Sequence, residues 1–249
     1  MKRKFEQAFD NYIKDYDMNV PQIRYKYYHS YRVKELMLEL ASKLNLSKKE
    51  KEVAEVIGLL HDIGRFEQIR NFGNCSDVKS GIDHADESCI YLFDNNHIKD
   101  FYDDENYYEI IKDAIKNHNK YIIDNNMKDT ELMFIKMIRD MDKVDIYKVI
   151  FDEYSYVYDK NEISKEVLDS FNNRKTIDSH FRKTKTDNIY GYCAFIYDIN
   201  FKETFRILKD GKYLENLFSV IVPKENSINE FNKLKNIVFS YIDNNIETK

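Results

Sequence analysis

Hydrophobic positions recur with the spacing of an amphipathic helix along almost the whole chain. One face of a first long helix carries apolar residues at this spacing: Val33, Leu36, Leu40 and Leu44. A second helix is expected to open at Ser47, because Glu50 follows three residues later as in a capping box. That helix should end near Gly64. Segment 65–81 has no clean period and is expected to be a loop, with helices at roughly 83–95, 106–118 and 129–150 and several more between 162 and 245.

The scarcity of glycine and proline supports an all-helical fold. The chain has 249 residues, of which only 6 are Gly and 2 are Pro, so few positions favour tight turns between strands. A polar stretch at about 159–186 marks a weak boundary. We therefore expect a core domain over residues 1–158 and, over 159–249, a helical extension that packs on the core and is not an independent domain.

Composition excludes several classes of protein. The net charge of −5 gives no overall field that would attract nucleic acid or an anionic membrane, so neither partner is expected. No apolar run reaches the ~18 residues of a transmembrane helix, and no signal peptide is visible. The 3 cysteines have no C-x-x-C spacing and are expected to be reduced. These features predict a cytoplasmic protein and leave its oligomeric state open.

Four histidines lie where the helical pattern buries them. His29 shares a face with the apolar stripe of the first helix, and His61 comes one turn after an apolar position of the second, with Asp62 next to it. His84 opens a helix, and His118 continues the apolar face of another. The other two histidines stand in polar surroundings and are expected to be solvated: His97 and His180.

The helix expected over about 129–150 places two carboxylates on its apolar face. Steps of about 100° per residue put Asp142 and Asp145 beside the inward positions Ile135, Ile138 and Val149. The same geometry turns three charged residues outward or to the flank: Lys136, Arg139 and Asp140. A carboxylate within an apolar stripe is costly unless it is paired, hydrogen-bonded or bound to a metal ion.

Imidazoles and carboxylates that all turn inward share one explanation, a divalent metal. Neutral imidazole and carboxylate suit Mn, Fe, Zn or Ni, and Mg or Co are also considered. Four His and two Asp exceed what one catalytic ion needs, so two ions are expected, with one carboxylate between them. The candidate ligands, taken together, are His29, His61, Asp62, His84, His118 and Asp142.

These residues resemble the HD-domain superfamily of metal-dependent phosphohydrolases, in the branch with two additional histidines. The segment L-L-H-D-I-G-R at 59–65 is similar to that family's L-L-H-D-I-G-K/R, and D-M-D-K-V-D at 140–145 is similar to D-A-D-K-L-D. The resemblance covers about residues 29–150. It implies an HD-type helical bundle in which Asp62 bridges two ions, His29, His61 and Asp142 complete one, and His84 and His118 complete the other.

The chain also departs from the family's pattern. Asn119 stands where many relatives have a further histidine, and Met141 replaces a common alanine. The Gly-Tyr-Pro signature of the cyclic-dinucleotide phosphodiesterases is missing, so that activity is not expected. A one-metal site, with His84 and His118 in other roles, remains an alternative.

The resemblance predicts a hydrolase that cleaves a phosphate ester or anhydride of a nucleotide or another small phosphorylated metabolite. Asp62 would orient a water activated by the ions, and Arg65 or Lys143 would neutralise the phosphate as catalytic and substrate-binding cations. Each of these two cations could equally form a structural ion pair. Two other functions stay open: a di-iron oxygenase on the same scaffold, or a non-catalytic module that binds a nucleotide.

Overall fold

A computed structural model describes residues 2–123, 127–150 and 156–247 of the chain. The chain divides into two compact units, residues 1–142 and 143–249. The division falls inside one helix, between Asp142 and Lys143. The expected boundary after residue 158, and the packing of the C-terminal part on the core, stay predictions. Each unit is described by itself.

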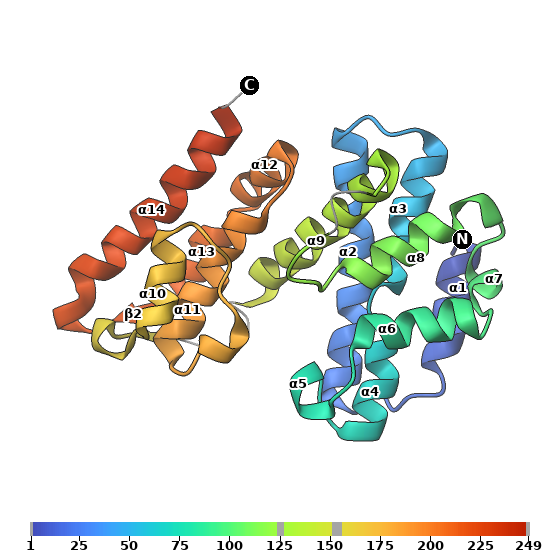
Figure 1. Ribbon diagram of the computed structural model, residues 1–249, viewed down its shortest axis with the longest axis horizontal. Helices are drawn as coiled ribbons and strands as arrows, with labels where there is room; N and C mark the ends of the chain where they lie inside the picture. Colours follow the sequence, from blue (N-terminus) through green and yellow to red (C-terminus); the bar gives the residue numbers. More distant parts are fainter. Residues whose placement is uncertain (1, 124–126, 151–155, 248–249) are drawn as a thin grey trace. The chain divides into compact units, whose positions relative to one another are not determined.

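The described part of the first unit is built from helices of very different lengths (Figure 1). In chain order they are α1 (Lys4–Ile13), α2 (Pro21–Lys43), α3 (Lys48–Leu60), α4 (Gly64–Phe72), α5 (Asp77–Ser80), α6 (His84–Cys89), the π-helical turn η1 (Ile90–Asp94), α7 (Ile98–Phe101), the 3-10 turn η2 (Glu105–Tyr107), α8 (Tyr108–Asn117) and α9 (Asp129–Val149), which continues into the second unit from Lys143 on. The expected helices around 83–95, 106–118 and 129–150 are thus confirmed, with their ends shifted by a few residues.

The pairing of α2 with α3 forms the centre of this unit. Pro21 occupies the first turn of α2, where its missing N–H leaves no bond unmade, and the predicted capping box opens α3: Ser47 Oγ accepts from the Glu50 amide at 3.3 Å. Gly58 lets the two helices approach closely, because a Cβ there would lie 2.8 Å from the Cα of Lys34. Apolar side chains on both helices are fully buried: Val33, Met37, Leu40, Val53, Val56 and Ile57.

The expected loop over 65–81 is wrong for most of its length. Helix α4 begins at Gly64 and runs to Phe72, and the short α5 follows. Phe66, Gln68 and Ile69 are buried, so α4 has an inward face that the sequence pattern did not reveal over so few residues. Gly73, with φ +68°, provides the left-handed end of α4.

Helix α9 corrects a second expectation. Arg139 and Asp140 were expected on its outer face or flank, yet their exposed fractions are 5% and 0%. The Arg139 guanidinium donates to backbone carbonyls at and beyond the end of α8, those of Asn117, His118 and Lys120. A cation at a helix C-terminus satisfies carbonyls that have no partner within the helix. Asp145 is buried as expected.

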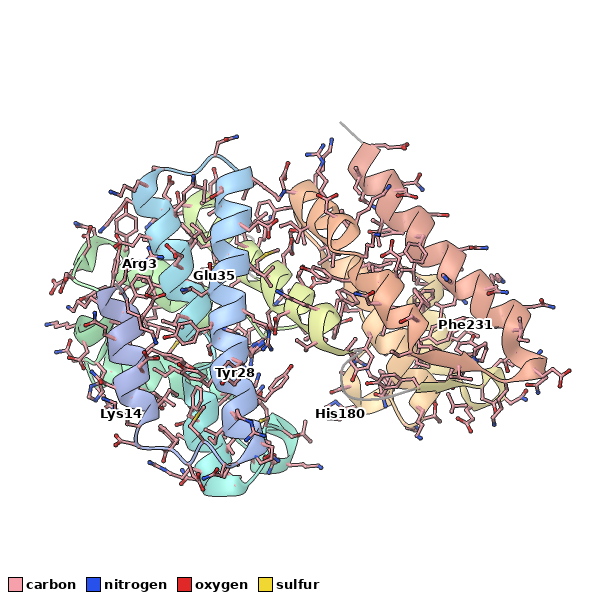
Figure 2. All side chains as sticks on the ribbon, turned by 180° about the vertical axis from the view of Figure 1, so that it is seen from behind. Arg3, Lys14, Tyr28, Glu35, His180 and Phe231 are labelled. Atoms are coloured by element: carbon pink, nitrogen blue, oxygen red, sulfur yellow. The ribbon has the colours of Figure 1, made fainter. Side chains whose placement is uncertain are left out.

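The second unit is also mainly helical. Its described elements after α9 are β1 (Tyr156–Tyr158), η4 (Lys160–Glu162), α10 (Lys165–Asn172), η5 (Ser179–Phe181), α11 (Lys185–Cys193), η6 (Ala194–Asp198), α12 (Lys202–Asp210), α13 (Tyr213–Ser219), β2 (Ile221–Pro223), η7 (Glu225–Ser227) and α14 (Ile228–Glu247). Strands β1 and β2 pair in parallel, with Tyr156 opposite Ile221. Phe231, labelled in Figure 2, lies on α14. The centroid of its ring is 5.5 Å from that of the buried Tyr158.

The prediction of an all-helical fold is confirmed, and within the described residues the two three-residue strands are the only departure from it. Among these residues, no helix has the length and apolar character needed to cross a bilayer.

Candidate metal centre

The ends of helices position most of the candidate ligands, all of them in the first unit. His61 and Asp62 directly follow α3, His84 is the first residue of α6, and His118 directly follows α8. His29 and Asp142 come from within α2 and α9. Asp83 caps α6, because its Oδ1 accepts from the Ala85 amide at 2.9 Å.

The structure brings the predicted residues together in two groups. In the first group, His29 Nε2 lies 3.2 Å from His61 Nε2 and 3.2 Å from Asp142 Oδ1. Asp62 Oδ2 lies 3.4 Å and 3.5 Å from the same two imidazole nitrogens. These four side chains therefore present nitrogen and oxygen atoms to one small volume.

The second group shares Asp62 through its other oxygen. Asp62 Oδ1 lies 3.2 Å from His84 Nε2 and 3.7 Å from His118 Nε2, and the two nitrogens are 3.0 Å apart. His84 and His118 are almost fully buried, as is Asp62 itself. Each oxygen of one carboxylate thus faces its own pair of histidines, the arrangement expected of a carboxylate between two ions.

Three of the four rings are anchored through their Nδ1 atoms. His61 and His118 contact the backbone carbonyls of Gly58 and Ile115 at 2.9 Å and 2.7 Å. His84 Nδ1 lies 2.7 Å from Asp77 Oδ2. An Nδ1–H that donates to such an acceptor leaves Nε2 as the free lone pair. When His84 and His118 are both neutral and held in this way, their Nε2 lone pairs face one another across 3.0 Å, and a shared cation or a proton stabilises them.

The protonation states fit a cation site. Burial acts to raise the pKa of Asp62, but the charge of Lys26 and the contacts with the histidines hold it well below its usual range. Burial likewise opposes ionisation of Asp142, whose pKa is nevertheless held well below the usual range by hydrogen bonds from His29 and His61. Burial lowers the pKa of His118 to about 4, so that ring is neutral at pH 7.

One buried atom in the centre is left without a hydrogen bond. Asp62 Oδ1 is inaccessible to solvent and, although it faces two histidines, has no hydrogen-bond partner among the residues that the structure describes. A buried carboxylate oxygen without a partner is costly, and a bound cation removes that cost. Neutral imidazoles and ionised carboxylates are also the donors that divalent transition metals prefer. The residues therefore fit divalent ions.

Close packing behind the centre holds α6 against the end of α3. A Cβ on Gly64 would lie 2.6 Å from the carbonyl oxygen of His84 and 2.7 Å from the amide of Ser88, so only glycine allows this approach. The Gly64 amide donates to Ser88 Oγ at 2.9 Å. Gly64 was expected as a helix stop, and the structure shows that it begins α4 and fixes the position of α6.

Arg65 is adjacent to the centre and already has carboxylate partners. Its Nη1 donates to Asp77 Oδ1 at 2.5 Å and to the Cys75 carbonyl at 2.7 Å, and its Nε lies 3.8 Å from Asp62 Oδ1. Asp77 in turn contacts His84, so the guanidinium supports the acceptor behind a candidate ligand. The expected role of Arg65 as a phosphate-binding cation stays a prediction.

The remaining charged candidates have surface or structural surroundings. Lys143 follows Asp142 on α9, and its ammonium lies 2.8 Å from Asp198 Oδ2 within the second unit. Its role in phosphate binding also stays a prediction. His97 and His180 are exposed as expected, with 44% and 67% of their side chains accessible.

Reasoning from the sequence missed three residues that support the centre: Lys26, Asp77 and Arg139. Lys26 Nζ lies 2.5 Å from Asp62 Oδ2. Its place one helical turn before His29 was a usable signal, because residues three apart on a helix are neighbours. Asp77 lies in the segment expected to be a loop, and no local pattern links it to His84. Asn119 stands where many relatives have a further histidine. Its side-chain amide donates to Asp83 Oδ1 at 2.8 Å.

Comparison with known families agrees with this geometry. Residues 27–147 match the family model described as the HD domain, which is about half of the chain. Over that region the chain belongs to the HD-domain superfamily. HD domains bind divalent metals and are typical of metal-dependent hydrolases, and the two histidine–aspartate groups described above could hold such ions. No curated protein and no solved structure gives a significant match to the chain.

Proposed function

We propose that this protein is a metal-dependent phosphohydrolase that cleaves a phosphate ester or anhydride in a nucleotide or another small phosphorylated metabolite. The observation that carries the proposal is the position of Asp62, whose two oxygens face separate pairs of histidines. Membership in the HD-domain superfamily supports it. The choice of a phosphorylated substrate rests on the resemblance to that superfamily.

Two divalent ions in such a centre supply a water of lowered pKa and stabilise the charge that develops on oxygens at phosphorus. His29, His61, Asp142 and Asp62 would hold one ion, and His84, His118 and Asp62 the other. The carbonyls of Gly58 and Ile115 and the Asp77 carboxylate keep three of the rings oriented with Nε2 toward the centre. Because these supports are already formed, binding needs little rearrangement of the rings.

The proposal retains Arg65 as a cation near the substrate. The Arg65 Nε atom is buried and has no hydrogen-bond partner within the described part of the chain, and it lies 3.8 Å from Asp62 Oδ1. A guanidinium can hold one carboxylate through Nη1 and keep another N–H for an anion. Lys143 is retained as the second predicted cation and would have to exchange its contact with Asp198 for the phosphate.

A screen of phosphorylated metabolites tests the proposal directly. Purified protein is stripped of metal with a chelator, reloaded separately with Mn, Fe, Mg, Co or Ni, and assayed for released phosphate. We expect turnover that depends on the metal and that falls by about a thousandfold or more in Asp62→Ala, because both halves of the centre lose a ligand. Metal analysis of the same samples should show a parallel loss of bound ion. Equal turnover by the variant would refute the assignment of the centre.

The two other functions give different outcomes in the same samples. A di-iron oxygenase would consume O₂ when loaded with iron and would release no phosphate. A non-catalytic module would bind a nucleotide in a calorimetric titration without turnover. The charge-matched control is Asp86→Ala, which removes a half-exposed carboxylate from α6 near the centre and should retain wild-type turnover.

A further inference from the structure

The two oxygens of Asp62 have unequal surroundings. Oδ1 faces His84 and His118 and, in the described ranges of the chain, has no hydrogen-bond partner. Oδ2 faces His29 and His61 and also lies 2.5 Å from Lys26 Nζ. A full positive charge therefore sits beside one half of the centre and in contact with the ligand oxygen that this half requires.

Lys26 is held in that place by the fold. It stands on α2 one turn before His29, so both side chains project from one face of the helix. Its side chain is only 15% exposed, and its ammonium lies 5.9 Å from the centroid of the Tyr25 ring. A lysine ammonium carries three N–H donors on a flexible stem, so it can contact a carboxylate and can also withdraw from it.

We infer that Lys26 acts as an internal cation that competes with a divalent ion for Asp62 Oδ2, so that the two halves of the centre bind ions with unequal affinity. The inference rests on the proposed metal centre and adds an order of loading to it. The half formed by His84, His118 and Asp62 Oδ1 fills first. The half formed by His29, His61 and Asp142 fills only when an ion displaces the ammonium from Oδ2 and overcomes its repulsion.

Electrostatics sets the sign of the effect. An ammonium within about 4 Å of a bound divalent cation repels it, and this repulsion is strong at a site shielded from water. Removing the ammonium also frees both lone pairs of Oδ2 for the ion. The half that contains Oδ1 lies on the other side of the carboxylate from the contact with Lys26, and because the repulsion weakens with distance, its affinity should change much less. The unequal affinity would let the concentration of metal decide whether the protein carries one ion or two.

Calorimetric titration with Mn²⁺ tests the inference without reference to activity. The full-length chain is stripped of metal and titrated as wild type, Lys26→Met and Lys26→Gln. In the wild type we expect two classes of site. In both neutral variants the weaker class should tighten by about tenfold or more, and the tighter class should change by less than about threefold.

Two control variants separate the local effect from a change in total charge. Arg24→Met removes one positive charge from an exposed position two residues away on the same helix, and it should leave both classes unchanged. Lys26→Arg keeps a cation beside Asp62 and should leave the weaker class weak. Titration of His118→Ala should show loss of the tighter class, which assigns that class to the half containing Oδ1.

Each outcome decides between the possibilities. An unchanged weaker class in Lys26→Met and Lys26→Gln, with two ions still bound, would overturn the inference and leave the metal centre intact. Loss of that class in both variants, with wild-type circular dichroism, would show that the ammonium assists ion binding and would also overturn it. Absence of Mn²⁺ binding in the wild type would refute the metal centre and the inference together.

Discussion

Asp77 offers the sharpest test of how the centre orients its ligands. Its Oδ2 lies 2.7 Å from His84 Nδ1, and its Oδ1 accepts from Arg65 and, at 3.0 Å, from Gln68. The carboxylate therefore fixes the tautomer of His84 that keeps Nε2 free. In Asp77→Ala the ring loses its acceptor and can rotate or change tautomer, although every candidate ligand is still present.

The expected magnitude follows from the kind of support that is lost. A carboxylate behind a metal-bound imidazole contributes about 10- to 100-fold to metal affinity, or roughly 1.4–2.7 kcal/mol. The burial of His84, whose exposed fraction is 3%, places the expected loss toward the upper end. The ion held by His29 and His61 should be affected by less than about threefold, because Asp77 contacts neither ring in the described structure.

Calorimetric titration of metal-stripped protein measures this loss, and ¹⁵N NMR of the histidine rings reports the tautomer of His84. Asp77→Asn is the conservative variant, since its amide oxygen can still accept from Nδ1, and it should lose less than about tenfold in affinity. Asp86→Ala removes an equal charge from α6 and should behave as the wild type. A change of less than threefold in Asp77→Ala, together with an unaltered ring signal, would refute the reasoning.

Two further substitutions test the packing of each unit. Gly64→Ala should lower the free energy of unfolding by about 2–3 kcal/mol and weaken metal binding, because its Cβ would meet the His84 carbonyl at 2.6 Å; thermal unfolding that matches the wild type would contradict this. Asp187→Ala should lower the free energy of unfolding, measured by urea denaturation, by about 3 kcal/mol. The reason is that the buried carboxylate accepts hydrogen bonds from Ser164, Lys183 and Thr184. Burial opposes ionisation of Asp187, but these bonds lower its pKa, so its stabilising effect is present above its ordinary pKa of about 4 and is lost as the pH falls below that value. The wild type should therefore lose stability in acid more steeply than the variant, and parallel pH profiles would contradict the assignment.

Much of the fold follows from short-range pattern. The apolar spacing of Val33, Leu36 and Leu40 predicts α2, and the Ser47–Glu50 pair predicts the start of α3, because helical periodicity and caps depend on residues within one or two turns. The same rule failed over α4, where nine residues are too few to establish a period and an initial glycine is a poor indicator of a helix.

The candidate ligands could also be predicted from the sequence, as a set. Each of His29, His61 and His118 lies on or directly after an apolar helical face, and the ordered series resembles a known family. Their separation in space could not be predicted, because it depends on where one helix crosses another. The structure shows that the nitrogens of the two histidine pairs are 3.2 Å and 3.0 Å apart.

The sequence by itself determined the set of candidate ligands and the helices that present them, because residue type and helical pattern are local properties of the chain. Only the tertiary structure decided which oxygen of Asp62 faces which histidines, that Lys26 contacts one of these oxygens, and that Asp77 stands behind His84. Arg139 illustrates the same division, since its buried contacts with the end of α8 contradict its expected outward direction. Such contacts join residues far apart in the chain, and their geometry is set by the packing of whole helices rather than by any neighbouring residue.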